Sequence, residues 1–168
     1  MKKLASLSLA VAIAVILAAC ASQPQFIPAN YAAADALLEQ LGDKLSPSQP
    51  LIVATIVNID ALERSSTLGR LVSEQVSARF SQAGLKMIEM KFRNNVYMKQ
   101  DEGELLLTRE LRDVAQNHNA QAVIVGTYGI SDETVFVNLK VIQPNTNIVI
   151  AVHDYVLPKD AEIRSMLR

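Results

Sequence analysis

The stretch "LIVATIVNIDALERSSTLGR", residues 51–70, decides the fold. Its first part, Leu51–Ile59, is a nearly unbroken apolar run in which β-branched residues dominate, and Pro50 and Asp60 bound it. A short apolar run of this kind is typical of a strand that is covered on both faces. We therefore expect a buried, central strand at these residues.

A helix is predicted directly after this strand. Apolar residues recur at helical spacing, and Gly84 follows them as a stop signal. The predicted apolar face consists of Leu68, Leu71, Val72, Val76, Phe80 and Ala83. Ser65, Ser66 or Thr67 can cap the first exposed amide groups of this helix. Strand and helix together form one β-α unit.

The rest of the chain alternates between helical and strand patterns. The further predicted elements are a helix over Tyr31–Leu45, a strand over Leu85–Phe92, a helix over about Glu104–His118, a strand over Ala122–Tyr128, and a hairpin of Thr134–Ile142 and Ile148–Leu157. The order is α-β-α-β-α-β-β-β, with a further short helix expected within Lys159–Arg168. A β-α-β-α-β run favours parallel strands, to which the closing hairpin adds antiparallel ones. We predict a single α/β domain of the α+β variant, with a mixed sheet of about five strands packed with three helices.

The amino terminus has the layout of an export signal. Lys2 and Lys3 precede Leu4–Ala19, which carries no charge and is too short for a transmembrane helix of about 20 residues. Leu17–Cys20 resembles the bacterial lipobox, in which a leucine and two small residues precede an acylated cysteine. We predict a signal peptide over residues 1–19 and lipid attachment at Cys20; the plain alternatives are an unused thiol or an intermolecular disulfide.

The lipid is expected to hold the mature protein on a membrane. Once acylated, Cys20 would carry three chains, and two already suffice for stable anchoring. Because Ala21 and Ser22 follow the cysteine, we expect the outer membrane, with the protein facing the periplasm. Residues 20–30, the acylated cysteine and a proline-containing uncharged tether, would hold the domain of residues 31–168 at most ~35 Å from the lipid.

The composition argues against several classes of function. The chain has 16 basic and 17 acidic residues, and removal of residues 1–19 leaves 14 basic and 17 acidic ones. Without a clustered basic face, a nucleic-acid partner is not expected. His118 and His153 have no second histidine or cysteine at metal-ligand spacing, so no metal or other cofactor is expected. No nucleophile motif or phosphate-binding loop is present, and we do not expect an enzyme.

Two segments are candidates for partner binding. The first carries Glu63, Arg64, Ser65, Ser66 and Arg70 directly after the central strand, where α/β folds tend to bind ligands. Helix capping explains most of this segment without a ligand.

The second segment is the polar stretch of residues 91–104, which contains Tyr97. Its plain alternative is a half-buried connector.

Several motifs together resemble the FlgO family of flagellum-associated outer-membrane lipoproteins. They are the lipobox, "YAAADALLEQLGDKL" (31–45), "PLIVATIVNIDALERSSTLGRLVSEQVSARF" (50–80), "GELLLTRELRDVA" (103–115) and "AQAVIVGTYGI" (120–130). The resemblance implies a palmitate-bearing protein at the flagellar base that supports motility without catalysis. The wider set of similar domains includes the curli secretion lipoprotein CsgG, the amino-terminal domain of TolB and a lipoprotein activator of penicillin-binding proteins.

Two classes of function remain open at this point. In the first, the protein is a structural component that contacts flagellar basal-body or outer-membrane ring proteins, in repeated copies as a possible homo-oligomer. In the second, it is a binding module that regulates a cell-envelope enzyme such as a peptidoglycan synthase. The short tether argues against the second class. A secretion pore is a weaker idea, because the sheet needs the only suitable hairpin.

Overall fold

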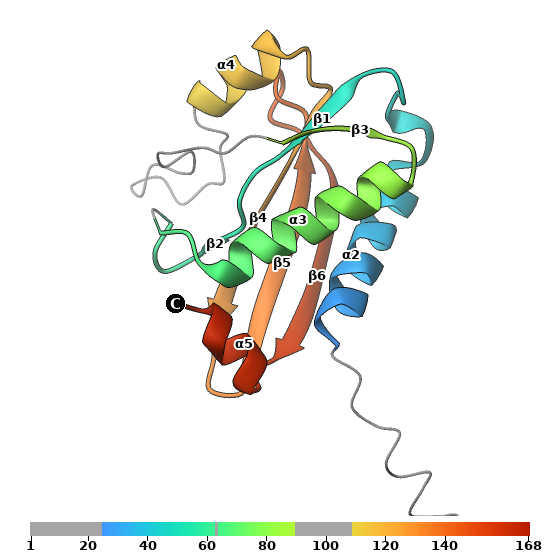
Figure 1. Cartoon of the computed structure of the whole chain (residues 1–168). Coiled ribbons are helices and arrows are strands. Elements are labelled where there is room, and N and C mark those ends of the chain that lie inside the picture. The colour runs from blue at the N-terminus through green and yellow to red at the C-terminus, as the bar shows by residue number, and fades with distance from the viewer. Residues whose placement is uncertain (1–24, 63, 90–108) are drawn as a thin grey trace, which may run out of the picture.

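The computed structural model describes residues 25–62, 64–89 and 109–168, and these residues form the predicted α+β domain (Figure 1). The helices are α2 (Phe26–Leu41), α3 (Thr67–Gln82), α4 (Arg109–Asn117) and α5 (Ala161–Met166), with a short 3₁₀ turn, η1 (Gly42–Lys44). The strands are β1 (Pro50–Val53), β2 (Val57–Asn58), β3 (Lys86–Glu89), β4 (Ala122–Ile130), β5 (Thr134–Ile142) and β6 (Val149–Pro158). The sheet has the order β3-β1-β4-β5-β6, and β2 pairs with β4. All pairs are parallel except β4 with β5 and β5 with β6.

The central strand differs from its prediction because it is divided into β1 and β2. The residues between the two strands turn their backbone toward α3, where the Ser73 hydroxyl accepts from the Ile56 amide at 2.9 Å. The same hydroxyl lies 3.1 Å from the Ala54 carbonyl oxygen. A side chain of the following helix therefore replaces sheet hydrogen bonds at this bend, and the sheet gains a sixth strand.

The first helix begins earlier than predicted. It starts at Phe26, not at Tyr31, because Phe26 and Asn30 are both buried in the domain. Pro28 is tolerated because the amide groups of a first helical turn have no partner within the helix. Residues 26–30 of the segment expected to be a tether therefore belong to α2, which leaves Gln25 as the last residue before the helix. Phe26 fixes the helix to the core.

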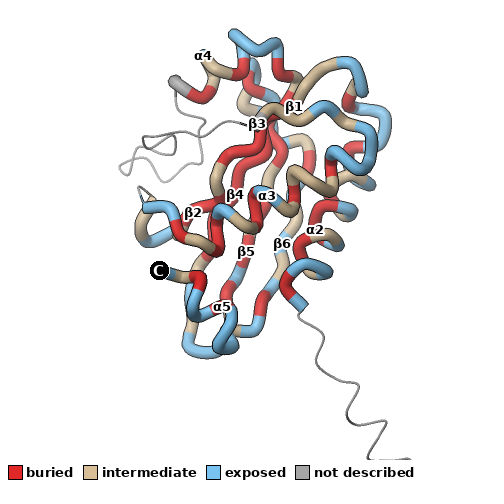
Figure 2. The backbone as a smooth tube through the Cα atoms, in the orientation of Figure 1, coloured by how far each residue is buried: buried red, intermediate tan, exposed pale blue. Residues whose placement is uncertain are grey.

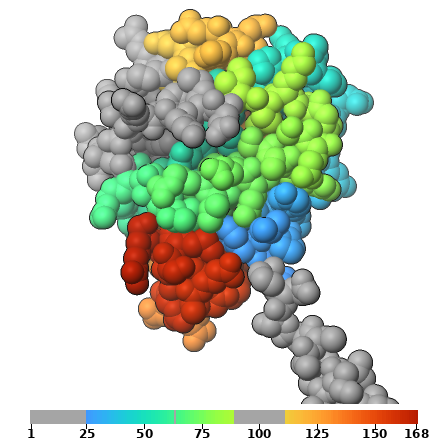
Figure 3. All heavy atoms as spheres, viewed as in Figure 1, coloured from blue at the N-terminus to red at the C-terminus, as the bar shows by residue number. Residues whose placement is uncertain are grey.

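Helices cover both faces of the sheet. On one face, α2, α3 and α5 pack over Leu51, Ile124 and Leu139, which belong to the larger core cluster. Figure 3 shows α3 across the middle of this face, with α5 below it. On the opposite face, α4 covers a smaller cluster that includes Ile52 and Val123. The alternation of Leu51 and Ile52 confirms that β1 is covered on both faces, and Figure 2 shows β4 buried along most of its length.

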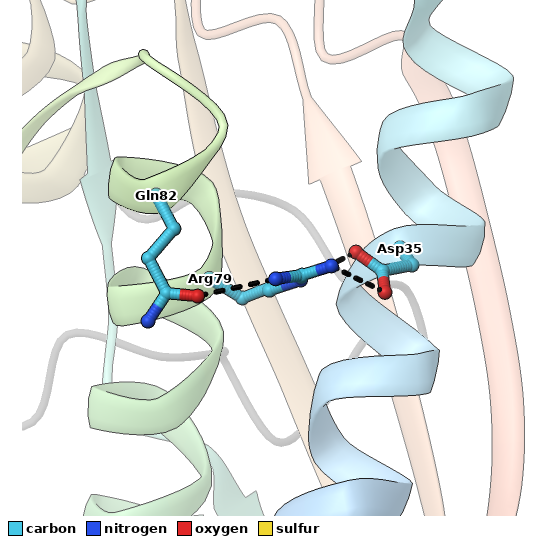
Figure 4. A network of polar contacts seen from close by, with 3 residues as sticks. All are labelled: Asp35, Arg79 and Gln82. Atoms are coloured by element: carbon cyan, nitrogen blue, oxygen red, sulfur yellow. Dashed lines mark hydrogen bonds and ion pairs between the residues drawn. The ribbon is translucent and has the colours of Figure 1, made fainter.

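Polar side chains also join the elements of the larger layer. Asn30 on α2 is fully buried; its amide donates to Gln75 Oε1 on α3 at 2.5 Å, and it accepts from the Tyr155 hydroxyl on β6. Burial raises the pKa of the Tyr155 hydroxyl well above its ordinary value, so this hydroxyl remains a donor. A second, exposed link joins Arg79 to both carboxylate oxygens of Asp35, at 2.6 and 3.0 Å (Figure 4). The hydrogen bond that Arg79 donates to Asp35 raises the pKa of Arg79.

A glutamine from α2 occupies part of the β6 edge. The Gln40 amide donates to the Val152 carbonyl oxygen at 2.9 Å, and the Val152 amide donates to Gln40 Oε1 at 3.2 Å. Both backbone groups of Val152 that point away from β5 are therefore satisfied by one side chain.

Candidate partner-binding site at the start of α3

The candidate site follows β2, at the carboxyl ends of the parallel strands. Val57 and Asn58 pair with Thr127 and Tyr128 of β4. The Asn58 side chain then accepts from the Asp60 amide at 3.0 Å, which starts a turn toward α3. The start of α3 thus lies where parallel sheets commonly present binding groups.

Ser66 is the amino-terminal cap of α3. Its hydroxyl oxygen accepts from the Gly69 amide at 3.0 Å and from the Tyr128 hydroxyl at 2.8 Å. Both side chains are almost completely buried, with 4% of Ser66 and 3% of Tyr128 exposed. The capping role predicted for this segment is confirmed for Ser66. Ser66 therefore holds the helix to β4 from inside the domain and leaves direct contact with a partner to its exposed neighbours.

Gly69 permits α3 to approach the bend between β1 and β2. A Cβ atom at this position would lie 1.8 Å from the carbonyl oxygen of Ile56. One turn later, the Ser73 hydroxyl lies 2.8 Å from the Gly69 carbonyl oxygen and accepts from the Ile56 amide. The sequence prediction did not identify Gly69, Ser73 or Tyr128, although an isolated glycine within a helical pattern is a known signal of close packing.

Two arginines are exposed among the described residues of the candidate site. Arg64, Ser65 and Arg70 are exposed, and we call these three residues the arginine surface. The Arg70 guanidinium donates to Ser65 Oγ and to Thr67 Oγ1, each at 3.1 Å. These contacts hold one guanidinium beside the start of the helix. Guanidinium groups bind carboxylates through paired hydrogen bonds, so this surface suits an acidic partner.

Three predicted residues lie outside the described part of the chain: Cys20, Glu63 and Tyr97. Their roles remain predictions. The structure therefore brings together Arg64, Ser65, Ser66 and Arg70, of which Ser66 alone is buried.

Other potential sites were considered among the described residues. Within them, no group of three or more His, Cys, Asp or Glu side chains is placed to hold a metal ion. The His153 ring stacks against Tyr155, whereas Asp154 accepts from Asn138 Nδ2 at 2.6 Å, as expected for adjacent strand residues that point to opposite faces. None of the helices in the described ranges is long and apolar enough to cross a membrane.

Comparison with known proteins identifies both a family and a fold. The family model described as "FlgO protein" matches residues 31–162. Among solved structures, the chain is similar to the LpoB C-terminal domain from Salmonella enterica, with a TM-score of 0.55 and 15% identity over 79% of this chain and 97% of that one. The corresponding domain from Escherichia coli gives a TM-score of 0.54 and 12% identity over the same shares. At these identities the structural likeness shows the fold alone. No curated protein matches the chain.

Proposed function

This chain belongs to the FlgO protein family, and on that premise we propose that it is a lipid-anchored outer-membrane protein at the base of the flagellum. In this role it faces the periplasm and supports motility through contacts with basal-body or outer-membrane ring proteins. The observation that carries the proposal is the extent of the family match, which spans residues 31–162 and includes the whole start of α3.

The proposed lipid anchor is at Cys20, within the motif Leu17–Cys20. Because α2 begins at Phe26, only residues 21–25 separate the cysteine from the helix. An extended chain advances about 3.3–3.6 Å per residue, so the domain would lie within roughly 20 Å of the lipid surface. A partner of this domain must therefore also lie at the membrane, as a ring protein at the flagellar base would.

We propose binding, with no catalysis, at the start of α3. The exposed side chains of the arginine surface are two guanidinium groups and one hydroxyl. An arginine remains protonated at physiological pH and does not act as a general base. The surface is therefore suited to hold a carboxylate-bearing protein partner.

The Cys20→Ala variant tests the anchor and its role together. In a deletion strain, we expect this variant to disappear from the outer-membrane fraction and to leave swimming impaired, because the acyl chains have no attachment point. Ser22→Ala is the matched control, since it keeps the cysteine and the three residues before it. Fractionation of the membranes and swimming in soft agar provide the measurements. Normal fractionation and normal swimming of Cys20→Ala would contradict the proposal.

The deletion strain also separates the two classes of function. The flagellar role predicts impaired swimming with unchanged cell shape and unchanged peptidoglycan crosslinking. A regulator of a peptidoglycan synthase would give altered crosslinking in cells that swim normally. That second result would replace the flagellar proposal.

Reversal of charge on the arginine surface tests the binding site. We expect Arg64→Glu with Arg70→Glu to reduce swimming while protein abundance stays unchanged, because two carboxylates would repel an acidic partner and weaken its binding at least about tenfold. The fold should tolerate the change, since an acidic residue is favourable near a helix amino terminus. Arg164→Glu with Arg168→Glu gives the same change in net charge at another exposed place. Equal swimming of the two double variants would exclude the arginine surface.

A further inference from the structure

Part of the sheet is exposed on the face that carries α4. Along β5 and β6, alternate side chains point toward the larger core, and those between them point away from it. Among the latter, Phe136 and Val156 are each 55% exposed and Val152 is 42% exposed. A groove of about 390 Å³ lies here and is lined mainly by apolar groups, including Ile59 and Gly129. Exposed apolar side chains that gather in this way are typical of an interaction surface.

The side chains that point away from the larger core are ordered in three rows across the two strands. The register pairs Phe136 with Val156, Asn138 with Asp154, and Lys140 with Val152. The middle row is joined by the 2.6 Å hydrogen bond from Asn138 Nδ2 to Asp154 Oδ1. We call these six residues the open face. It has an apolar row at one end, a polar row that carries a carboxylate, and a row with one lysine.

We propose that the open face packs against the open face of a second copy of this chain, about a two-fold axis parallel to β5 and β6. Such an axis exchanges the two strands and preserves each row. Phe136 then meets Val156 of the partner subunit, and Asn138 meets Asp154 of the partner subunit. Lys140 packs its aliphatic chain on Val152 of the partner subunit, with its ammonium group one row from a carboxylate. The face is thus complementary to itself, as an isologous interface requires.

The opposite orientation is unfavourable for the same side chains. An axis perpendicular to the strands and centred on the middle row would place Asp154 against Asp154 of the partner subunit. It would also place Lys140 against Phe136 of the partner subunit. Two facing carboxylates repel each other, and removal of unpaired charges from water is costly. The charge pattern therefore selects the parallel arrangement of the two sheets.

The position of the amino terminus favours the same axis. The start of α2 lies at the carboxyl end of β6, where Tyr155 contacts Asn30 (Figure 1). In the parallel dimer both α2 helices start at the same end, so both chains can be anchored in one membrane. In the opposite orientation the two α2 helices would point in opposite directions along the strands, so their starts would not face the same side. This step alone depends on the proposed anchor.

The free edge of β6 is a less suitable surface for a second copy. Both outward backbone groups of Val152 are bonded to Gln40, so a neighbouring strand would have to displace this side chain. Face-to-face packing leaves these bonds intact.

Crosslinking of the full-length protein in isolated membranes tests the dimer. Two differently tagged copies are co-expressed, one with Phe136→Cys and one with Val156→Cys, and are treated with a short bis-maleimide. We expect a crosslinked heterodimer in several-fold higher yield than for Ile27→Cys with Val156→Cys, because Ile27 is similarly exposed, at 51%, but lies on α2. A higher yield for Phe136→Cys with Lys140→Cys would overturn the parallel axis. A yield no higher than the control, or a crosslink to a different protein, would overturn the second copy as the occupant.

A charge within the open face provides the second measurement. Light scattering of the full-length protein in detergent should give the mass of two copies for the wild type and for Phe136→Leu, and of one copy for Phe136→Glu, with unchanged circular dichroism. A two-copy mass for Phe136→Glu would contradict the proposal. Neither measurement uses swimming, so failure of the dimer is distinguishable from failure of the flagellar role. If Cys20→Ala leaves the membrane yet keeps the Phe136–Val156 crosslink, the dimer forms without the anchor. If the wild type is also released from the membrane, the proposed anchor is wrong.

Discussion

Replacement of Gly69 by alanine is expected to lower the free energy of unfolding by about 3 kcal/mol or more, because the added methyl group has no space. Its Cβ atom would lie 1.8 Å from the Ile56 carbonyl oxygen, and the obstructing atom belongs to the backbone. Relief requires that α3 move away from the bend between β1 and β2. Such a movement would stretch the bonds of the Ser73 hydroxyl, which holds the same bend. Urea unfolding of the purified protein, followed by far-ultraviolet circular dichroism, measures the loss.

Gly129→Ala is the matched control for this prediction. A Cβ atom at Gly129 would have Ile59 Cγ2 as its nearest neighbour, at an ordinary distance of 3.7 Å. Alanine also has a lower conformational entropy than glycine in the unfolded chain, so the expected change in the free energy of unfolding is within about 1 kcal/mol. If the two variants unfold at the same urea concentration, the close approach of α3 is not a constraint on the fold.

Replacement of Asn30 by alanine is expected to lower the free energy of unfolding by about 2–3 kcal/mol, because it leaves partly buried polar groups without this partner. Asn30 is fully buried and joins Gln75 on α3 to Tyr155 on β6. Without the amide, the Tyr155 hydroxyl remains in an apolar layer with no acceptor from α2. Urea unfolding of the purified protein again provides the measurement.

A double-mutant cycle with Tyr155→Phe identifies the cause. In the wild type, Tyr155→Phe removes a hydrogen bond; in the Asn30→Ala background it removes an unsatisfied hydroxyl, so its cost should be much smaller there. Strictly additive costs would show that the two side chains do not interact.

The pH dependence of stability provides a further check of the cycle. Burial raises the pKa of Tyr155 in the folded state. The contribution of its neutral hydroxyl to the free energy of unfolding is therefore complete below the unfolded-state pKa of about 10, and it is lost as the pH rises above that value. The wild type should therefore lose stability above this pH more steeply than Tyr155→Phe.

Local patterns were sufficient to predict most of the elements. The helix over Thr67–Gln82, its serine cap and the hairpin of β5 and β6 follow from spacing and capping rules that act within a few residues. Asn119, directly after the predicted helix end at His118, has the left-handed conformation that is common for asparagine in this place, with φ of 51°. These features depend little on the rest of the chain.

Features that depend on distant residues could not be predicted in this way. Asn30 was assigned to a tether because its segment contains two prolines and no charge, but Tyr155, at a separation of 125 residues, makes the burial of Asn30 favourable. The division between β1 and β2 depends on Ser73 and on pairing with β4. Within the candidate site, Ser66 was considered as a partner contact. Its hydroxyl is instead buried, where it accepts a hydrogen bond from Tyr128, 62 residues away. Arg64 and Arg70 belong to one segment because only six positions separate them in the sequence, and their role as partner contacts stays a prediction.

The contact between Gln40 and β6 has a consequence for proteins that are crowded on a surface. Proteins held on a membrane surface meet at high local concentration. An unpaired edge strand of a β-sheet can then form hydrogen bonds with the edge strands of neighbouring molecules. The Gln40 side chain forms hydrogen bonds with the Val152 amide and carbonyl, and these bonds oppose strand pairing at this point of the edge. On a membrane, where the proposed lipid anchor would hold it, the domain could thereby lie beside its neighbours without forming sheet hydrogen bonds with them.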